Sequence, residues 1–313
     1  MPPYDLADRL VVGVASSALF DLTEADAVFR EEGEARYRAY QEEHLDRTLA
    51  PGVAHPFLRR LLSLNDLAPR DDPLVEVIVL SRNDPDTGLR VMRSIQSHDL
   101  PITRAIFTQG RSPHRFMPAL NMSLFLSADE HDVREAVAAG LPAGYVVGSP
   151  TEDDAEDRDL RIAFDFDGVL ADDAAERIYQ ADGLDTFRSH ESANARTPHV
   201  PGPLRDFLAG VNRVQQREEE RRRRDPDYRI RVHVSLVTAR NAPAHERAVR
   251  SLKDWGVTVN DAFFLGGIDK AAIIGVLKPH IFFDDQMGHL VGASRNAPSV
   301  HVPFGTLNER SDG

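Results

Sequence analysis

The chain has 313 residues, with 37 basic and 50 acidic side chains and a formal net charge of −13. That balance disfavours a protein that grips nucleic-acid backbone, because such binding depends on a surplus of Lys and Arg. The sequence contains no Cys, which excludes a disulfide framework, a zinc-thiolate site and a cysteine nucleophile, and fits a reducing cytoplasm.

Length and hydrophobicity indicate a soluble protein of about two domains. Apolar residues make up 42% of the chain, and the most apolar windows, such as residues 75–80 and 230–237, are the length of strands. They are too short to span a membrane. The first residues, Met1 to Asp5, lack a basic flank followed by a long apolar run, so we expect an unexported, cytoplasmic protein.

The pattern of the chain predicts an α/β fold. Short runs rich in β-branched or aromatic residues alternate with longer segments of helical period, which favours parallel strands joined by crossover helices. The acidic, polar stretch from Ser149 to Asp159 is typical of an exposed linker. We therefore expect two domains, residues 1–150 and residues 151–313.

The segment from Asp172 to Tyr228 is too long for a simple crossover, so we expect a small, mostly helical cap at about residues 172–228. Within it, the run from Arg217 to Arg224 mixes three acids with five arginines. The acids favour a solvated helix end or loop over a nucleic-acid surface.

The C-terminal half contains apolar runs with the length and composition of strands. They are Arg161–Phe166, Ile230–Thr238, Ala262–Leu265, His280–Asp284 and Ser299–Val302. Between the second and third runs we predict a helix, which Asn241 can cap, Pro243 can start and Gly256 can end. Its apolar face would consist of Ala248, Val249, Leu252 and Trp255.

An internal repeat runs through the chain. A shift of 157 positions sets residues 75–81 against residues 232–238, and the match continues without a gap. Upstream, a shift of 150 pairs Phe29, Gly33 and Tyr37 with Tyr179, Gly183 and Phe187. Chance similarity between two α/β units is the alternative, but constant offsets over long stretches favour two copies of one domain.

Paired carboxylates follow two of the predicted strands. Asp165 and Asp167 end one strand, and parallel sheets bind ligands at that edge. The two side chains share a face if the strand continues, and a divalent cation would relieve their repulsion. Asp284 and Asp285 end another strand and supply the oxygen ligands that Mg²⁺ prefers.

Thr238 and Lys270 complete this set, each at or near a strand end. A hydroxyl and an ammonium are suited to the non-bridging oxygens of a phosphoryl group. Each feature alone is ordinary, since an Asp-x-Asp often forms a solvated turn and a Lys is usually on the surface. Their order along one α/β domain is specific. The overall acidity does not exclude an anionic substrate, because a bound cation reverses the local field.

The order of these residues resembles the four motifs of the haloacid-dehalogenase (HAD) superfamily of phosphohydrolases. Nearly the whole chain resembles the cytosolic 5′-nucleotidase type I family. The similar segments are residues 236–240, 279–287 and 301–305, and in the N-terminal half residues 16–21 with Tyr40 and Gln41. The chain departs from the family's animal members at Phe166 and Gly168, beside the intact carboxylates.

The resemblance implies two tandem HAD-like Rossmannoid domains, the C-terminal one carrying the cap. It also implies Mg²⁺-dependent hydrolysis of a nucleoside 5′-monophosphate, AMP in particular. Asp165 would attack phosphorus to form an aspartyl-phosphate, and Asp167 would act as general acid and then as general base. Mg²⁺ would be held by Asp165, Asp284 and the backbone carbonyl of Asp167, with Asp285 as a ligand or beside one.

The resemblance also suggests residues for the rest of the substrate. Thr238 and Lys270 would clamp the phosphoryl group, and Arg240 would assist, although an Arg in this place is often an ion-pair partner. Apart from the resemblance, the expected cap offers Tyr179, Phe187 and His190 to stack on or hydrogen-bond the base. The alternative for such aromatic residues is packing in the core. Two histidines near the acids, His280 and His289, receive no role because Mg²⁺ prefers oxygen.

Other functions remain compatible with these residues. A dehalogenase would use Asp165 without Asp167 or a metal, whereas a sugar phosphatase or phosphotransferase would share every catalytic residue. A non-enzymatic nucleotide-binding protein would be expected to lose a carboxylate, and the second copy has kept them all. We expect a nucleotide as partner, no nucleic acid and no membrane, and leave a homo-oligomer open.

The first copy has lost this chemistry. The offset of 150 places Ala15 and Ser17 at the positions of Asp165 and Asp167. The offset of 157 places Pro113, Ser127 and Ala128 at the positions of Lys270, Asp284 and Asp285. Thr238 alone finds an equivalent hydroxyl, at Ser81. We therefore expect residues 1–150 to form a degenerate, catalytically silent HAD-like domain.

Overall fold

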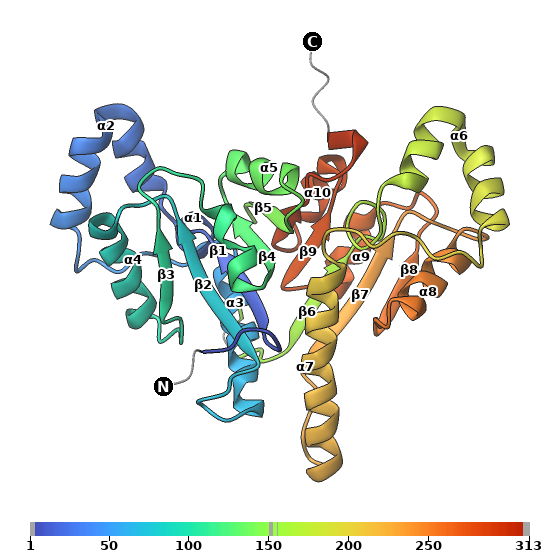
Figure 1. The fold of residues 1–313 in the computed structure, drawn as a ribbon, viewed down its shortest axis with the longest axis horizontal. Coiled ribbons are helices and arrows are strands. Elements are labelled where there is room, and N and C mark those ends of the chain that lie inside the picture. The colour runs from blue at the N-terminus through green and yellow to red at the C-terminus, as the bar shows by residue number, and fades with distance from the viewer. Residues whose placement is uncertain (1–3, 150–152, 155, 309–313) are drawn as a thin grey trace. The chain divides into compact units, whose positions relative to one another are not determined.

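The computed structural model describes residues 4–149, 153–154 and 156–308 (Figure 1). The chain divides into two compact units, Met1–Val146 and Val147–Gly313. The boundary predicted between residues 150 and 151 falls on residues outside the described ranges. Among the described residues, no helix combines the length and the apolar character needed to cross a membrane.

The first unit is a parallel sheet with helices around it. Its strands are β1 (Leu10–Val14), β2 (Val75–Ser81), β3 (Arg104–Phe107), β4 (Met122–Ser127) and β5 (Ala143–Val147), in the order β3-β2-β1-β4-β5. Its helices are α1 (Ser16–Leu19), α2 (Thr23–Glu43), α3 (His55–Ser63), α4 (Pro85–Ser97) and α5 (Glu130–Ala138), with short 3₁₀ helices η1 (Leu64–Leu67), η2 (Pro113–Phe116) and η3 (Pro118–Leu120). Val133 of α5 packs with Val11, Ile78 and Phe125 of the strands.

The second unit is also a parallel sheet. Its strands are β6 (Leu160–Phe164), β7 (Val232–Thr238), β8 (Asp261–Phe264), β9 (Ile281–Asp284) and β10 (Ser299–His301), in the order β8-β7-β6-β9-β10. Its helices are α6 (Ala174–Ala193), α7 (Arg205–Arg224), α8 (His245–Asp254), α9 (Lys270–Leu277) and α10 (Met287–Ala293), with a short 3₁₀ helix η4 (Thr306–Asn308). The predicted α/β class with parallel strands is confirmed.

The strands and the helix predicted for this unit are present, with shifted ends. No strand end moves by more than two residues. The helix α8 begins at His245 with Ala244 as its N-cap, so the predicted cap at Asn241 is wrong. The carbonyl of Asn241 instead accepts a hydrogen bond from the His245 amide, which closes a turn before the helix. Val249, placed on the apolar face by the sequence, is 49% exposed.

Alternate residues of β6 and β9 face opposite layers of this unit. The rings of Phe164 and Phe283 stack at 5.2 Å, and Phe207 of α7 lies against both. Their neighbours Ala163 and Phe282 pack with α9 and α10 on the other face. Phe207 thus places α7 in the core layer, and α6 is the other helix within residues 172–228, where the sequence predicts a cap.

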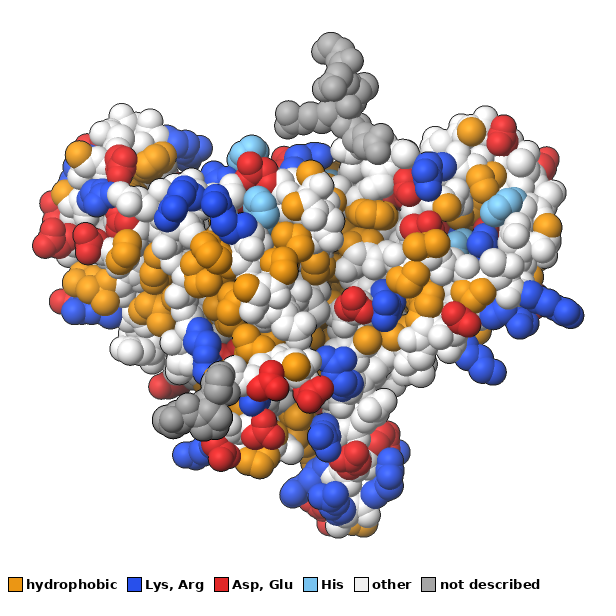
Figure 2. Space-filling model, viewed as in Figure 1, with side chains coloured by type: hydrophobic (Ala, Val, Ile, Leu, Met, Phe, Trp, Pro, Cys, Tyr) orange, Lys and Arg blue, Asp and Glu red, His pale blue; other side chains and the backbone are white. Residues whose placement is uncertain are grey.

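The charged run from Arg217 to Arg224 forms the last turns of α7, as predicted for a helix end. Figure 2 shows its basic and acidic side chains side by side at the lower end of this helix. Glu218 departs from the prediction because it is fully buried. Its carboxylate accepts hydrogen bonds from the backbone amides of Arg231 and Val232, at the start of β7.

The two units share their strand order and their register. β1 and β2 pair Val12 with Val77, and β6 and β7 pair Ile162 with Val234. These pairs are related by the offsets of 150 and 157 positions found in the sequence. A backbone kink recurs as well, since α2 and α6 both bend at a glycine, Gly33 with φ +82° and Gly183 with φ +79°.

Candidate active site

Three adjacent strands of the second unit, β7, β6 and β9, end at the same edge of the sheet. Asp165 follows the last residue of β6, Thr238 is the last residue of β7, and Asp284 is the last residue of β9. Lys270 opens α9, which leads into β9. Parallel strands therefore bring these sequence-predicted residues together at the edge where ligands bind.

The ammonium of Lys270 joins the two carboxylates at the centre of this edge. Its Nζ lies 2.7 Å from Oδ2 of Asp165 and 2.7 Å from Oδ2 of Asp284, and all three side chains are buried. Burial favours the neutral amine, but the two carboxylates outweigh it and raise the pKa of Lys270. Lys270 is therefore a fixed positive charge at neutral pH.

The two carboxylates differ in their protonation. Burial raises the pKa of Asp165 to about 6, against the opposing effect of Lys270. Burial acts on Asp284 in the same direction, but Lys270 and His289 hold the pKa of that carboxyl below its usual value. At neutral pH both groups are ionised, in a region of low dielectric.

Asp285 lies at the same edge, directly after Asp284. The side chain is 3% exposed, and its Oδ1 has no hydrogen-bond partner within the part of the chain that the structure describes. Burial, together with the charges of Asp165 and Asp284, raises the pKa of Asp285 to about 9. The loop after β6 passes close by, because a Cβ built on Gly168 would meet Asp285 Oδ2 at 2.4 Å. Gly168 also has φ +70°, so both its backbone conformation and its contact require glycine.

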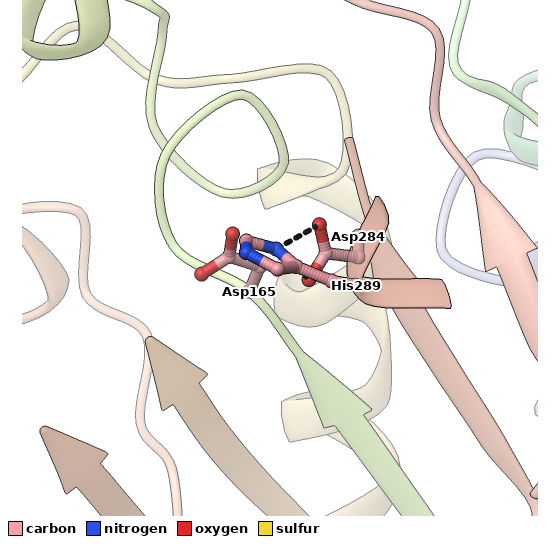
Figure 3. A group of neighbouring side chains, drawn as sticks. All are labelled: Asp165, Asp284 and His289. Carbon is pink, nitrogen blue, oxygen red and sulfur yellow. Dashed lines mark hydrogen bonds and ion pairs between the residues drawn. The ribbon is translucent and has the colours of Figure 1, made fainter. Parts of the chain in front are cut away.

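These groups fit a hard divalent cation. Asp165, Asp284 and His289 each offer a ligand atom, and these atoms lie within 4.8 Å of one another (Figure 3). The unpartnered oxygen of Asp285 adds a further buried donor to a site already rich in carboxylate. Carboxylate oxygens are the donors that Mg²⁺ prefers. His289 had no predicted role, yet its Nδ1 lies 3.2 Å from both oxygens of Asp284.

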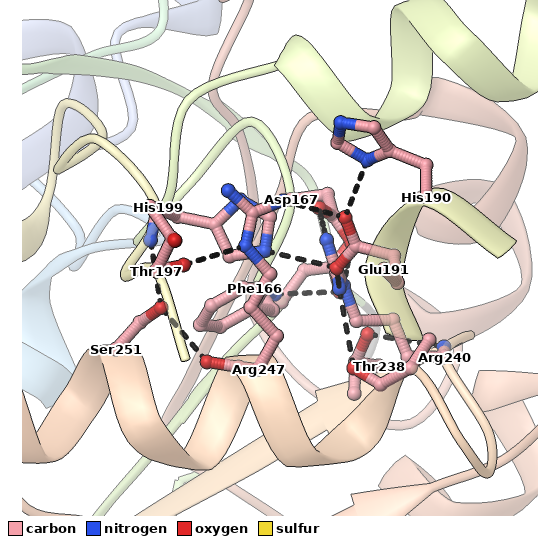
Figure 4. A network of polar contacts seen from close by, with 12 residues as sticks. Phe166, Asp167, His190, Glu191, Thr197, His199, Thr238, Arg240, Arg247 and Ser251 are labelled. Carbon is pink, nitrogen blue, oxygen red and sulfur yellow. Dashed lines mark hydrogen bonds and ion pairs between the residues drawn. The ribbon is translucent and has the colours of Figure 1, made fainter. Parts of the chain in front are cut away.

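Arg240 holds the second carboxylate of the Asp-x-Asp pair. Its Nε donates to Oδ2 of Asp167 at 2.7 Å and its Nη2 donates to Oδ1 at 2.6 Å, a two-pronged ion pair (Figure 4). The guanidinium lies over the ring of Phe166, with 5.0 Å between its carbon and the ring centroid. In this structure Arg240 thus contacts carboxylates, and Thr238 supports it by accepting a hydrogen bond from the Arg240 amide at 3.2 Å.

Glu191 of α6 is a buried carboxylate that the sequence did not reveal. It pairs with Arg240 Nη1, with Arg247 Nη1 at 2.7 Å, and with His199 Nε2 at 3.1 Å (Figure 4). Burial would raise its pKa, but His199 and Arg240 outweigh burial and hold the pKa well below its usual value. The signal that could have found it is the repeat, which sets Glu191 against Gln41.

The residues predicted to contact a base come from α6. Tyr179 is 42% exposed, and its ring meets that of Phe187 edge to face at 6.2 Å. Phe187 is buried against Ala175 and Ala244, so it also packs. Nδ1 of His190 lies 3.3 Å from Glu191.

His280 lies away from these residues. It precedes β9, at the opposite end of that strand from Asp284, and its Nδ1 accepts a hydrogen bond from the Arg161 amide.

Comparison with known proteins adds independent findings. The chain matches the model of a family described as 5'-nucleotidase over residues 2–309. Human "Cytosolic 5'-nucleotidase 1B" is 31% identical over 293 residues, which is 92% of this chain and 48% of the human protein. The chain therefore spans about half the length of this curated relative.

Proposed function

The chain belongs to the 5′-nucleotidase family, and we propose that it hydrolyses nucleoside 5′-monophosphates, AMP in particular, to nucleoside and phosphate. The observation that carries this proposal is the buried ammonium of Lys270 between Asp165 and Asp284. That arrangement supplies a nucleophile, an acidic cation site and a positive charge for a phosphoryl group. We further propose a cytoplasmic protein, in keeping with the cytosolic relative.

Asp165 is the proposed nucleophile. One of its oxygens attacks phosphorus and forms an acyl phosphate as the bond from phosphorus to the 5′ oxygen breaks. Asp167, which would have to take up a proton and free one oxygen from Arg240 when substrate binds, gives that proton to the departing 5′ oxygen. As a carboxylate, Asp167 then takes a proton from the water that breaks the acyl phosphate, which releases phosphate and restores both side chains.

Lys270 and Thr238 would bind the non-bridging oxygens of the phosphoryl group through an ammonium and a hydroxyl. Arg240 would keep Asp167 in place and contact the substrate. Asp165, Asp284 and the backbone carbonyl of Asp167 would hold Mg²⁺. Asp285 would be a ligand or lie beside one. When bound, the cation would neutralise charge on the phosphoryl oxygens and on the crowded carboxylates.

The helix α6 is proposed to cap the site. Its exposed Tyr179 would stack on the base, with Phe187 behind it and His190 at the rim. The exposure of Tyr179 supports this, because an aromatic ring that is partly open to solvent can stack on a planar ligand.

We propose that the first unit is a degenerate copy of the second, with domains at residues 1–150 and 151–313. The shared strand order and register support this duplication. Ala15 and Ser17 in place of Asp165 and Asp167 would leave it without a nucleophile. Cations diffused into crystals should lie beside Asp165 and should be absent beside Ser17.

The second candidate is a HAD phosphatase or phosphotransferase that acts on another small phosphate ester. It would share the catalytic residues and differ in α6. Phosphate release from a panel of nucleoside monophosphates and sugar phosphates, with Mg²⁺, distinguishes the two. We expect AMP or another nucleotide to have the highest kcat/KM, and a sugar phosphate preferred by more than about tenfold would favour the second candidate. Absence of release from every ester would indicate a nucleotide-binding protein.

A further inference from the structure

We infer that Glu191 is a positioning residue that acts through Arg240 on Asp167, and so governs proton transfer to the leaving group. The inference rests on the proposed function, because it requires Asp167 to act as a general acid. Glu191 itself would contact neither substrate nor metal.

Arg240 is the link between the two carboxylates. Two of its nitrogens hold Asp167, as described above, and the third, Nη1, donates to Glu191 and to the carbonyl of Ala244 at 3.3 Å. Arg240 is 4% exposed, and its guanidinium carbon lies 5.0 Å and 5.5 Å from the ring centroids of Phe166 and Phe187. A guanidinium held on three sides fixes the plane in which Asp167 is bound.

Glu191 is itself anchored by groups that do not contact Asp167. Arg247 of α8 donates through Nη1 to Oε1 of Glu191 at 2.7 Å and through Nε to the carbonyl of Thr197 at 2.8 Å. His199 Nε2 lies 3.1 Å from the other oxygen. Helices α6 and α8 together therefore fix the position of Arg240. Arg240 in turn fixes the orientation of the Asp167 carboxylate.

The first unit provides an internal comparison for this framework. Arg90, the counterpart of Arg247, donates through Nη1 to Oε1 of Gln41 at 3.1 Å and through Nε to the carbonyl of Arg47 at 3.0 Å. Gln41 occupies the position of Glu191. An amide is thus sufficient to hold the helices together at this point of the fold.

The charged residues change together between the two units. Asp167, Arg240 and Glu191 correspond to Ser17, Asn83 and Gln41. All three charges are present in the unit that has the nucleophile and absent in the unit that has lost it. The domain can therefore fold without a negative charge at the position of Glu191. That charge is present in the unit where Asp167 is proposed to transfer a proton.

An amide at position 191 would disturb this arrangement. The two carboxylate oxygens lie within hydrogen-bond distance of four cationic or imidazole groups, on Arg240, Arg247, His199 and His190. A glutamine has one acceptor oxygen, and its NH₂ group would face a donor. Glu191→Gln keeps the volume of the side chain but leaves Arg240 or Arg247 without its partner, so Asp167 loses its fixed orientation.

The test compares two leaving groups. The nucleoside 5′ oxygen departs poorly unless it is protonated, whereas p-nitrophenolate departs without a proton. We expect Glu191→Gln to lower kcat/KM for AMP by about 100-fold, within the range of general acid catalysis, and kcat/KM for p-nitrophenyl phosphate by less than about threefold. Glu191→Asp keeps the charge on a shorter side chain and should show the same preference with a smaller loss.

Glu218→Gln is the matched control, because Glu218 is an equally buried glutamate that binds the backbone at the start of β7. It should change the ratio of the two kcat/KM values by less than about twofold.

Equal losses on the two substrates in Glu191→Gln and Glu191→Asp, or no loss on AMP, would overturn the inference while leaving the proposed function intact. A wild-type protein inactive toward nucleotides would overturn the proposed function and the inference with it.

Discussion

The ammonium of Lys270 lies 2.7 Å from the carboxylate of Asp165, inside a buried site. Burial raises the pKa of Asp165 to about 6, and the ion pair limits that rise. At neutral pH the carboxylate is therefore ionised, as an attacking nucleophile must be, yet poorly solvated. The same ammonium contacts Asp284 at 2.7 Å, so nucleophile and proposed cation ligand share one positive charge.

Removal of metal should stop turnover. Asp165 and Asp284 place two negative charges where an anionic phosphate must enter, and Lys270 supplies only one positive charge to offset them. We expect exhaustive treatment with EDTA to reduce phosphate release to background, and Mg²⁺ to restore it. Unchanged activity after chelation would instead indicate a metal-free, dehalogenase-like reaction.

Gly168→Ala should damage the site more than the fold. A Cβ at this position would meet Asp285 Oδ2 at 2.4 Å, and φ is +70°. We expect kcat/KM to fall at least about tenfold, because Asp285 or the loop that carries Asp167 must move. The control is Gly256→Ala after α8, where φ is +67° and, apart from the adjacent residues, no described atom lies within 4 Å of the new Cβ.

The control should lose about 1 kcal/mol of stability from backbone strain alone and keep its activity. Equal activity in the two variants would show that the contact with Asp285 does not matter for turnover.

Tyr179→Ala should weaken nucleotide binding. Loss of a stacked base costs about 1–3 kcal/mol, so KM for AMP should rise about tenfold or more with little change in kcat. The control is Phe29→Ala, because Phe29 and Tyr37 form the corresponding edge-to-face pair in the first unit, at 5.6 Å. If both substitutions raise KM equally, or neither does, Tyr179 is not part of the base site.

Asp132 in the first unit should make stability depend on pH. Burial outweighs the nearby Arg82 and raises the pKa of Asp132 to about 6, against 3.8 for the ordinary side chain. The folded state therefore binds this proton more tightly, and its stabilising contribution is lost as pH rises from about 4 to about 6. Asp132→Asn removes this effect because its side chain is neutral at every pH.

We expect Asp132→Asn to melt at a higher temperature than the wild type at about pH 7.5, and the difference to shrink toward zero at about pH 4. Glu130→Gln, at an exposed neighbouring position, should change little at either pH. A difference in melting temperature that is independent of pH would contradict the assignment.

The sequence predicted the strands and the carboxylates at their ends because both are local signals. An apolar run marks a buried strand, and acids directly after it must lie at the carboxyl edge. The parallel pairing of β7, β6 and β9 then brings Thr238, Asp165 and Asp284 together without further information. The strand ends were accurate to two residues for the same reason.

The network around Glu191 could not be predicted in this way. Its members lie on α6, on α8 and after β6 and β7, and nothing in the local sequence distinguishes a buried Glu from an exposed one. The packing of α7 could not be predicted either, because this helix is amphipathic and strongly charged at its end, and only its contacts with Phe164 and Phe283 place it on the sheet. Val249 shows the same limit, since the apolar pattern alone does not tell that it is 49% exposed while Ala248 and Leu252 of the same helix are buried.

The most direct test of the account is to trap phosphate on Asp165. The protein is mixed with Mg²⁺ and AMP labelled with ³²P, quenched in acid within the first turnovers, digested and mapped for an alkali-labile label. We predict label on the peptide that contains Asp165 in the wild type, and neither label nor phosphate release in Asp165→Asn, whose amide cannot attack. Steady hydrolysis of AMP without trapped label, a label on another residue, or more than about a tenth of wild-type activity in Asp165→Asn would contradict the account.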